Sequence, residues 1–135
     1  MYNKRSMSAC NINYLITTGG SKSSFNTVGE IKRRGTMIRV NFVDEGGAKK
    51  TFSVIENKVV VSSLGEATYS FTLKKGEEYK FLLQTPMGEI ASQIQCRSLL
   101  IKTQPNVLVK AKYVSDIGGN VNTYEFRLDV KEIEC

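Results

Sequence analysis

Four basic residues stand close together early in the sequence, where they could bind a phosphate or another anion. Three are consecutive, Lys32, Arg33 and Arg34, and Arg39 follows on the far side of a turn at Gly35. Ammonium and guanidinium groups gathered in this way suit phosphate oxygens. The same charges would also serve if they were only solvated, or if they kept a sheet edge from pairing with another chain. These four residues are therefore candidate anion contacts.

Nucleic acid is a less favoured partner for this basic cluster. Barrels that bind nucleic acid add exposed aromatic side chains on which bases stack. In this sequence the aromatic residues fall on the apolar side of alternating segments, so a stacking platform is not evident.

Aromatic residues at the apolar positions of the alternating segments form a second candidate site. If these segments are strands whose apolar face points inward, the rings share one interior. Such rings, some with phenolic tips, suit a pocket for a small apolar or amphipathic molecule with one or two polar groups. Alternatively, the same rings fill a closed barrel by packing against each other. The candidate interior contacts are Phe42, Tyr69, Phe71, Tyr79, Phe81, Tyr113, Tyr124 and Phe126.

The chain shows no arrangement of residues typical of catalysis. It contains no histidine, which excludes histidine-dependent triads and dyads as well as histidine zinc sites. Glu77 and Glu78 are adjacent, so they would point to opposite faces of a strand. The stretch TTGGS at 17–21 lacks the Gly-Lys-Ser/Thr ending of a phosphate-binding loop. We therefore expect a protein that is not an enzyme and has no catalytic residue, cofactor or metal site.

The cysteines and the N-terminal residues indicate where the protein works. Cys10, Cys96 and Cys135 are far apart and form no Cys-x-x-Cys pair, which fits a reducing compartment. The segment after the first five residues is too polar for a secretion signal, and no apolar run approaches the length of a membrane span. These features predict a cytoplasmic protein that does not associate with membranes.

A period of two in the apolar residues dominates the chain and predicts β-strands. The clearest case is 124–133, where Tyr124, Phe126, Leu128 and Val130 alternate with charged residues. Turns containing Gly or Asn separate such segments at short intervals, and no segment shows a helical period. The pattern predicts an all-β protein with a single antiparallel up-and-down barrel of about 8–10 strands.

The length of 135 residues fits one domain. We expect a flexible N-terminal tail over residues 1–8 and one barrel domain over residues 9–135. Gly29 interrupts an otherwise extended segment, so it is a candidate bulge at which the barrel bends.

Several longer segments resemble a known family. They are VGEIKRRGTMIRVNFVDE (28–45), PMGEIASQIQCRSL (86–99), VLVKAKYV (107–114) and TYEFRLDVKEI (123–133). Together they resemble the YwiB-like family of small bacterial β-barrel proteins, over roughly residues 8–133. The resemblance implies a calycin-like barrel, and it implies no particular reaction or ligand.

The sequence therefore predicts a calycin- or lipocalin-like barrel that binds a small, partly apolar ligand in its interior. The alternative is a structural or interaction module whose basic end contacts nucleic acid or another anionic partner. A hollow interior predicts binding with little salt dependence, whereas the basic end predicts an affinity that falls steeply with salt.

Overall fold

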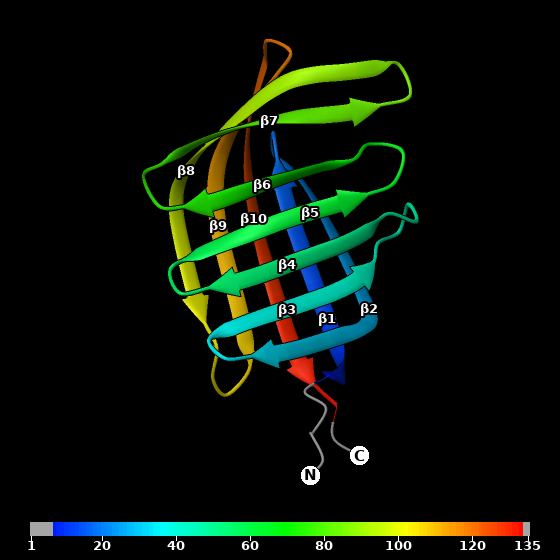
Figure 1. Cartoon of the computed structure of the whole chain (residues 1–135), viewed down its shortest axis with the longest axis vertical. Coiled ribbons are helices and arrows are strands. Elements are labelled where there is room, and N and C mark those ends of the chain that lie inside the picture. Colours follow the sequence, from blue (N-terminus) through cyan, green and yellow to red (C-terminus); the bar gives the residue numbers. More distant parts are fainter. Residues whose placement is uncertain (1–6, 134–135) are drawn as a thin grey trace.

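The computed structural model describes residues 7–133, and within that range the chain is all β with no helix. Ten strands follow one another along the chain (Figure 1). They are β1 (Met7–Thr18), β2 (Ser21–Arg34), β3 (Met37–Val43), β4 (Lys49–Ile55), β5 (Lys58–Leu64), β6 (Tyr69–Lys74), β7 (Glu78–Thr85), β8 (Gly88–Lys102), β9 (Val107–Ile117) and β10 (Asn120–Glu132). The predicted fold class is confirmed.

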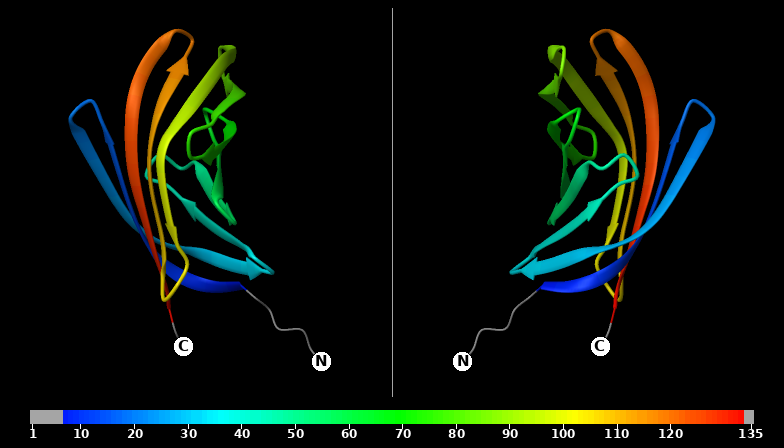
Figure 2. Two further views of the ribbon diagram at one scale, coloured as in Figure 1. Left: turned by 90° about the vertical axis from the view of Figure 1, so that its left-hand side faces the viewer. Right: turned by 90° about the vertical axis from the view of Figure 1, so that its right-hand side faces the viewer.

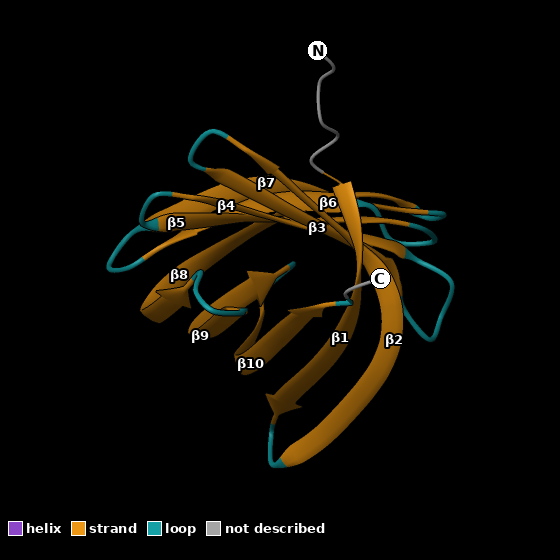
Figure 3. Ribbon diagram, turned by 90° about the horizontal axis from the view of Figure 1, so that it is seen from below, coloured by secondary structure: helices purple, strands orange, loops and turns teal. Residues whose placement is uncertain are grey.

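The strands form one antiparallel sheet in the order β6-β5-β4-β3-β2-β1-β10-β9-β8-β7. Neighbours in sequence pair as hairpins, and the ladder between β1 and β10 joins the two ends of the chain. The sheet curls so that β3 to β6 cross over β8, β9, β10 and β1 (Figures 1 and 3). This is the nearly closed, calycin-like barrel that the sequence predicts.

The first strand begins earlier than the sequence suggests. Met7 pairs with Lys32 and Ser8 pairs with Ile31, so both residues belong to β1 and to the barrel. The remainder of the predicted tail, residues 1–6, lies outside the described residues.

One described backbone bridge spans the seam between β6 and β7: Thr68, just before β6, and Gln84 of β7 exchange both backbone hydrogen bonds, at 2.9 Å each. The turn between β6 and β7 is held against β8, because the amide of Gly76 donates to the carbonyl of Cys96 at 2.9 Å. A bulge at Arg97 shifts the register of β8 against β9 next to this contact. The register of β2 against β1 is unbroken at Gly29, so the bulge that the sequence suggests is absent there, although the strand bends at this residue.

Strand β2 serves the barrel in two different ways along its length. It pairs with β1 from end to end, but with β3 only over its last five residues, Glu30 to Arg34. Its first part turns away from β3, and Figure 2 shows the hairpin of β1 and β2 flaring from the strands opposite. The bend falls at Gly29, where a Cβ would lie 2.6 Å from Cδ1 of Ile12 and also against the carbonyl oxygen of Asn41.

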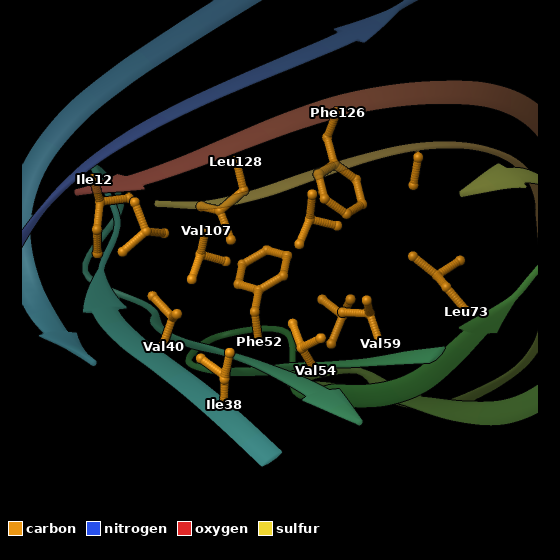
Figure 4. Packing of buried hydrophobic residues seen from close by; sticks show 14 of the residues in the cluster. Ile12, Ile38, Val40, Phe52, Val54, Val59, Leu73, Val107, Phe126 and Leu128 are labelled. Carbon is orange, nitrogen blue, oxygen red and sulfur yellow. The ribbon is translucent and has the colours of Figure 1, made fainter. Parts of the chain in front are cut away.

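Aliphatic side chains pack together in the half of the barrel nearer the start of β1 and the end of β10 (Figure 4). Ile12, Val40, Val109 and Leu128 are at most 1% exposed, and they come from both sides of the curled sheet. Burial of this kind is the main favourable term in folding. The tight packing here leaves the other half of the barrel as the place where a ligand could enter.

The bend at Gly29 gives the first testable prediction. Gly29→Ala should lower the free energy of unfolding by about 2 kcal/mol, because overpacking a well-packed site typically costs ~1–3 kcal/mol. Urea unfolding measures the change.

Gly46→Ala is the matched control, since the only atom that its Cβ would meet within 4 Å is Oδ1 of Asp44, at 3.6 Å. That variant should stay within about 0.5 kcal/mol of the parent protein. Equal urea midpoints for the two variants would show that the close approach at Gly29 does not matter.

Candidate ligand-binding pocket

A pocket of about 480 Å³ occupies the half of the barrel that the aliphatic core leaves free. Its walls come from nine strands and from the turns after β3 and β5, so residues far apart in sequence meet there. Most of the lining is aromatic or aliphatic. The few polar groups are Ser23, Asp44, Glu45, Lys50 and Ser115, together with the tyrosine hydroxyls.

Six of the eight aromatic residues predicted to face the interior line this pocket. Alternation along each strand predicts their side correctly, because successive side chains point to opposite faces. The six are Tyr69, Phe71, Phe81, Tyr113, Tyr124 and Phe126.

The other two predicted residues lie elsewhere. Phe42 is inside the barrel but below the pocket, 5% exposed and stacked on Phe52 with ring centroids 6.0 Å apart. Tyr79 does not line the pocket, and its side chain is 40% exposed. Tyr79 lies on β7, which borders the seam with β6. The one described backbone bridge across this seam, between Thr68 and Gln84, is at the other end of β7, so the seam is open beside Tyr79. The prediction of an interior position for Tyr79 is corrected accordingly.

Three important lining residues were not among the predicted contacts. Tyr14 and Phe25 lie opposite each other on β1 and β2. The sequence could have indicated an inward position for Tyr14, since Ile12, Tyr14 and Ile16 are spaced two residues apart and share one face of the strand. The sequence gives no such indication for Lys50, because a lysine at an inward position breaks the apolar alternation that marks the interior.

A layer of rings forms the floor of the pocket and separates it from the aliphatic core. Tyr14 contacts Phe52, Phe42 and Phe126, with centroids 5.7, 5.9 and 5.9 Å apart respectively. Phe52 also lies 5.5 Å from Phe126. Tilted arrangements at these distances are favourable for aromatic pairs. The floor is therefore closely packed and mainly apolar.

A second group of rings continues the wall across the seam between β6 and β7. Phe71 is central, with centroids 5.6 Å from Tyr69, 5.3 Å from Phe81 and 5.6 Å from Tyr113. Tyr113 stacks on Tyr124 at 5.5 Å. These side chains come from β6, β7, β9 and β10, so the pocket wall also helps to hold the seam together.

One polar group stands in the wall formed by β4 and β6. Lys50 Nζ donates to the hydroxyl of Tyr69 at 3.0 Å and lies 3.8 Å from Oδ2 of Asp44. The other carboxylate oxygen of Asp44 accepts from the amides of Gly46 and Ala48, at 3.0 and 2.9 Å, and so shapes the turn after β3. The lysine side chain is only 14% exposed.

Hydroxyl groups complete the polar part of the pocket. Ser115 is 3% exposed, and its buried Oγ has no hydrogen-bond partner among the described residues. Burial raises the pKa of Tyr14 well above its usual range, and the neighbouring Tyr69 and Asp44 add to the shift. Burial, together with the surrounding tyrosines, likewise raises the pKa of Tyr113. Both phenols therefore stay protonated at neutral pH.

The structure does not gather the four predicted anion contacts into one patch. Arg33 falls on the inward side of β2, where its guanidinium bonds Oε1 of Glu132 at 2.9 Å near the ends of β2 and β10. Lys32 and Arg39 are direct cross-strand partners on the outer face. Arg34 is exposed beside the turn between β2 and β3. The outer face thus keeps three of the four charges.

Other chemistry is sparse within residues 7–133. Cys10 and Cys96 are buried free thiols, and burial raises the pKa of Cys10 to about 11. No group of three or more metal-ligating side chains occurs in this range. Nor does any helix in it have the length and apolar character needed to cross a membrane.

Comparison with known proteins finds one matching family model and a solved structure with a similar fold. A family model described as "Domain of unknown function (DUF1934)" matches residues 11–129. Among solved structures, the ywiB protein from Bacillus subtilis is similar, with a TM-score of 0.77 and 13% sequence identity over 96% of this chain and 95% of that one. No curated protein matches the chain. The resemblance to the YwiB-like family is confirmed by the family model and by the fold.

The raised phenol pKa of Tyr14 predicts a loss of stability at alkaline pH. Its contribution is complete below the ordinary tyrosine value of 10.0 and is lost as pH rises above it, because only the unfolded chain ionises readily there. We expect the urea midpoint to fall over this range, and to fall less steeply in Tyr14→Phe. An equally steep fall in both proteins would mean that Tyr14 does not contribute to the pH dependence.

Proposed function

Because the chain belongs to the DUF1934 family of domains of unknown function, we propose from its own pocket that it binds a small, partly apolar molecule inside the barrel. The proposed role is binding without catalysis. Among the described pocket residues, the one ion pair joins Lys50 and Asp44. Lys50 also bonds the hydroxyl of Tyr69, and Asp44 also bonds the turn after β3, so neither activates a nucleophile, which supports this role.

The observation that carries the proposal is the contrast between the two halves of the barrel. One half is closed by aliphatic side chains, whereas the other encloses about 480 Å³ lined mainly by aromatic and aliphatic groups. Pockets for small molecules usually measure about 300–1,000 Å³ and combine an apolar lining with a few polar groups. A barrel filled only for stability would need no such space.

The splay of the β1 and β2 hairpin supports access to this space. Ser23 and Phe25 lie on the part of β2 that pairs only with β1, and both line the pocket. The turn after β3 faces them through Glu45 and Gly46. A ligand would enter between this hairpin and this turn. The two buried free thiols fit the cytoplasmic setting that we propose for this binding.

An uncharged aromatic dye tests the proposed function. N-phenylnaphthylamine becomes fluorescent in apolar surroundings, and we expect it to bind the purified protein at one site. Ser23→Trp should weaken binding at least about tenfold, because the added ring occupies the entrance, and tenfold corresponds to about 1.4 kcal/mol.

Ser24→Trp is the matched control. Ser24 is the neighbour of Ser23 on β2 and points to the outer face, so the same substitution there should leave the affinity within about twofold, a change of ~0.4 kcal/mol. If the wild-type protein does not bind the dye, or if both variants bind it like the wild type, the pocket is not the binding site.

A second candidate function rests on the outer face of β2 and β3. Lys32 and Arg39 lie directly opposite each other, and within residues 7–133 neither forms an ion pair. Like charges in this position destabilise a sheet unless an anion lies between them. The Nε of Arg39 is also buried, and it has no hydrogen-bond partner in the described part of the chain. A phosphate of a nucleic acid would suit this pair.

The second candidate predicts RNA binding that weakens steeply with salt. Lys32→Glu combined with Arg39→Glu should then abolish binding of a single-stranded RNA oligonucleotide in a fluorescence anisotropy titration. Lys110→Glu combined with Lys112→Glu makes the same change in charge on the outer face of β9 and should weaken binding much less. Equal losses in both pairs would indicate attraction by net charge alone.

A further inference from the structure

We infer that the molecule bound in the pocket carries one anionic, oxygen-bearing group, such as a carboxylate, that lies against Lys50 and Tyr69 while its apolar body packs on the aromatic floor. This inference rests on the proposed function, because it names the chemical class of the ligand for the same pocket. The observations that carry it are the unpaired donors of Lys50 and the hydroxyl of Tyr69.

Lys50 has more donors than the protein satisfies. An ammonium group carries three N–H donors and no acceptor. One reaches the hydroxyl of Tyr69 at 3.0 Å, whereas Oδ2 of Asp44, at 3.8 Å, is beyond hydrogen-bond distance. Two donors are therefore left on a side chain that is only 14% exposed. Such a group favours a negatively charged acceptor in the pocket.

Asp44 does not take the place of that acceptor. Its Oδ1 is already occupied by the amides of Gly46 and Ala48, which hold the turn after β3. Its Oδ2 remains too far from Lys50 for a hydrogen bond, although it reduces the cost of burying the ammonium group. The carboxylate of Asp44 therefore lies near the ammonium group of Lys50 without accepting a hydrogen bond from it.

The phenol and hydroxyl groups add further donors. The hydroxyl of Tyr69 accepts from Lys50, so its own hydrogen is left to donate. Ser115 stands on β9, a strand from the other side of the curled sheet, with a buried Oγ that has no partner in the described residues. Ser115 adds a polar group to the pocket wall but has no described contact with Lys50 or Tyr69. The hydrogen of Tyr69 is the donor that lies beside Lys50, and it is available to the same ligand oxygen.

The pocket lining contains two acidic residues, Asp44 and Glu45, and one basic residue, Lys50, and the position of Lys50 argues against a cationic group beside Tyr69. A cation near Tyr69 would meet the Lys50 ammonium group, which lies 5.3 Å from the centroid of that ring. The remaining acidic lining residue, Glu45, is exposed in the turn at the pocket entrance. The volume of about 480 Å³ suits a body of one or a few rings, or a short chain, beside this single head group.

Two dyes with the same aromatic body test this inference. Anilinonaphthalene sulfonate differs from N-phenylnaphthylamine only by its sulfonate group. We expect the wild-type protein to bind the sulfonate dye more tightly. Lys50→Met should weaken binding of the sulfonate dye at least about tenfold, because the hydrogen bond between the sulfonate and the ammonium group is lost, and should change binding of the neutral dye less than about twofold.

Lys49→Met is the matched control, because Lys49 is the exposed neighbour of Lys50 and does not line the pocket. It should leave both dyes within about twofold of the wild type. Tyr69→Phe keeps the ring and the lysine but removes the hydroxyl, so it should weaken the sulfonate dye about threefold and spare the neutral dye. This second variant retains the test if Lys50→Met does not fold.

The dye measurements distinguish an error in the proposed anionic group from an error in the proposed pocket. If the neutral dye binds but Lys50→Met and Lys49→Met affect the sulfonate dye equally, the anionic group is wrong and the pocket function stands. The same holds if both dyes lose affinity equally in Tyr69→Phe. If the wild-type protein does not bind the neutral dye, the proposed function fails, and the inference about its ligand fails with it.

Discussion

The bend of β2 at Gly29 is the constraint on which the rest of the structure depends. Before the bend, β2 pairs with β1 alone; after it, the strand also pairs with β3. One strand therefore closes the barrel near the chain ends and opens it at the other end. Only glycine fits there, because Ile12 and Asn41 occupy the space of a Cβ. The position of the aliphatic core and that of the pocket both follow from this division.

The layer of rings around Phe52 allows a dry core and a polar pocket to share one small barrel. Phe52 is fully buried and contacts Tyr14, Phe42 and Phe126. Below it the side chains are aliphatic and need no hydrogen-bond partner. Above it the phenol of Tyr14 and the ammonium of Lys50 lie in the pocket wall, where a polar atom can still reach solvent or a ligand. The same rings thus stabilise the fold and define the pocket.

The sequence predicts the fold well because alternation and turn residues are local signals. It predicts which face a residue such as Phe71 or Phe126 occupies, but not its depth, so Phe42 falls below the pocket and Tyr79 falls beside the seam. The seam itself depends on contacts between Thr68 and Gln84, which no local pattern reveals. Inward charges are missed for the same reason: Arg33 and Lys50 break the apolar alternation, and only their distant partners explain their positions.

The polar residues of the pocket separate what folding requires from what binding requires. The fold is shared with the ywiB protein at 13% identity, so a pattern of strands and turns suffices to build the barrel. An alanine in place of Ser115 would leave no unpaired hydroxyl, and an apolar side chain in place of Lys50 would need no partner. Stability alone therefore does not favour these two residues. The presence of Lys50 in an otherwise aromatic wall is explained if a ligand supplies the acceptor that the protein lacks.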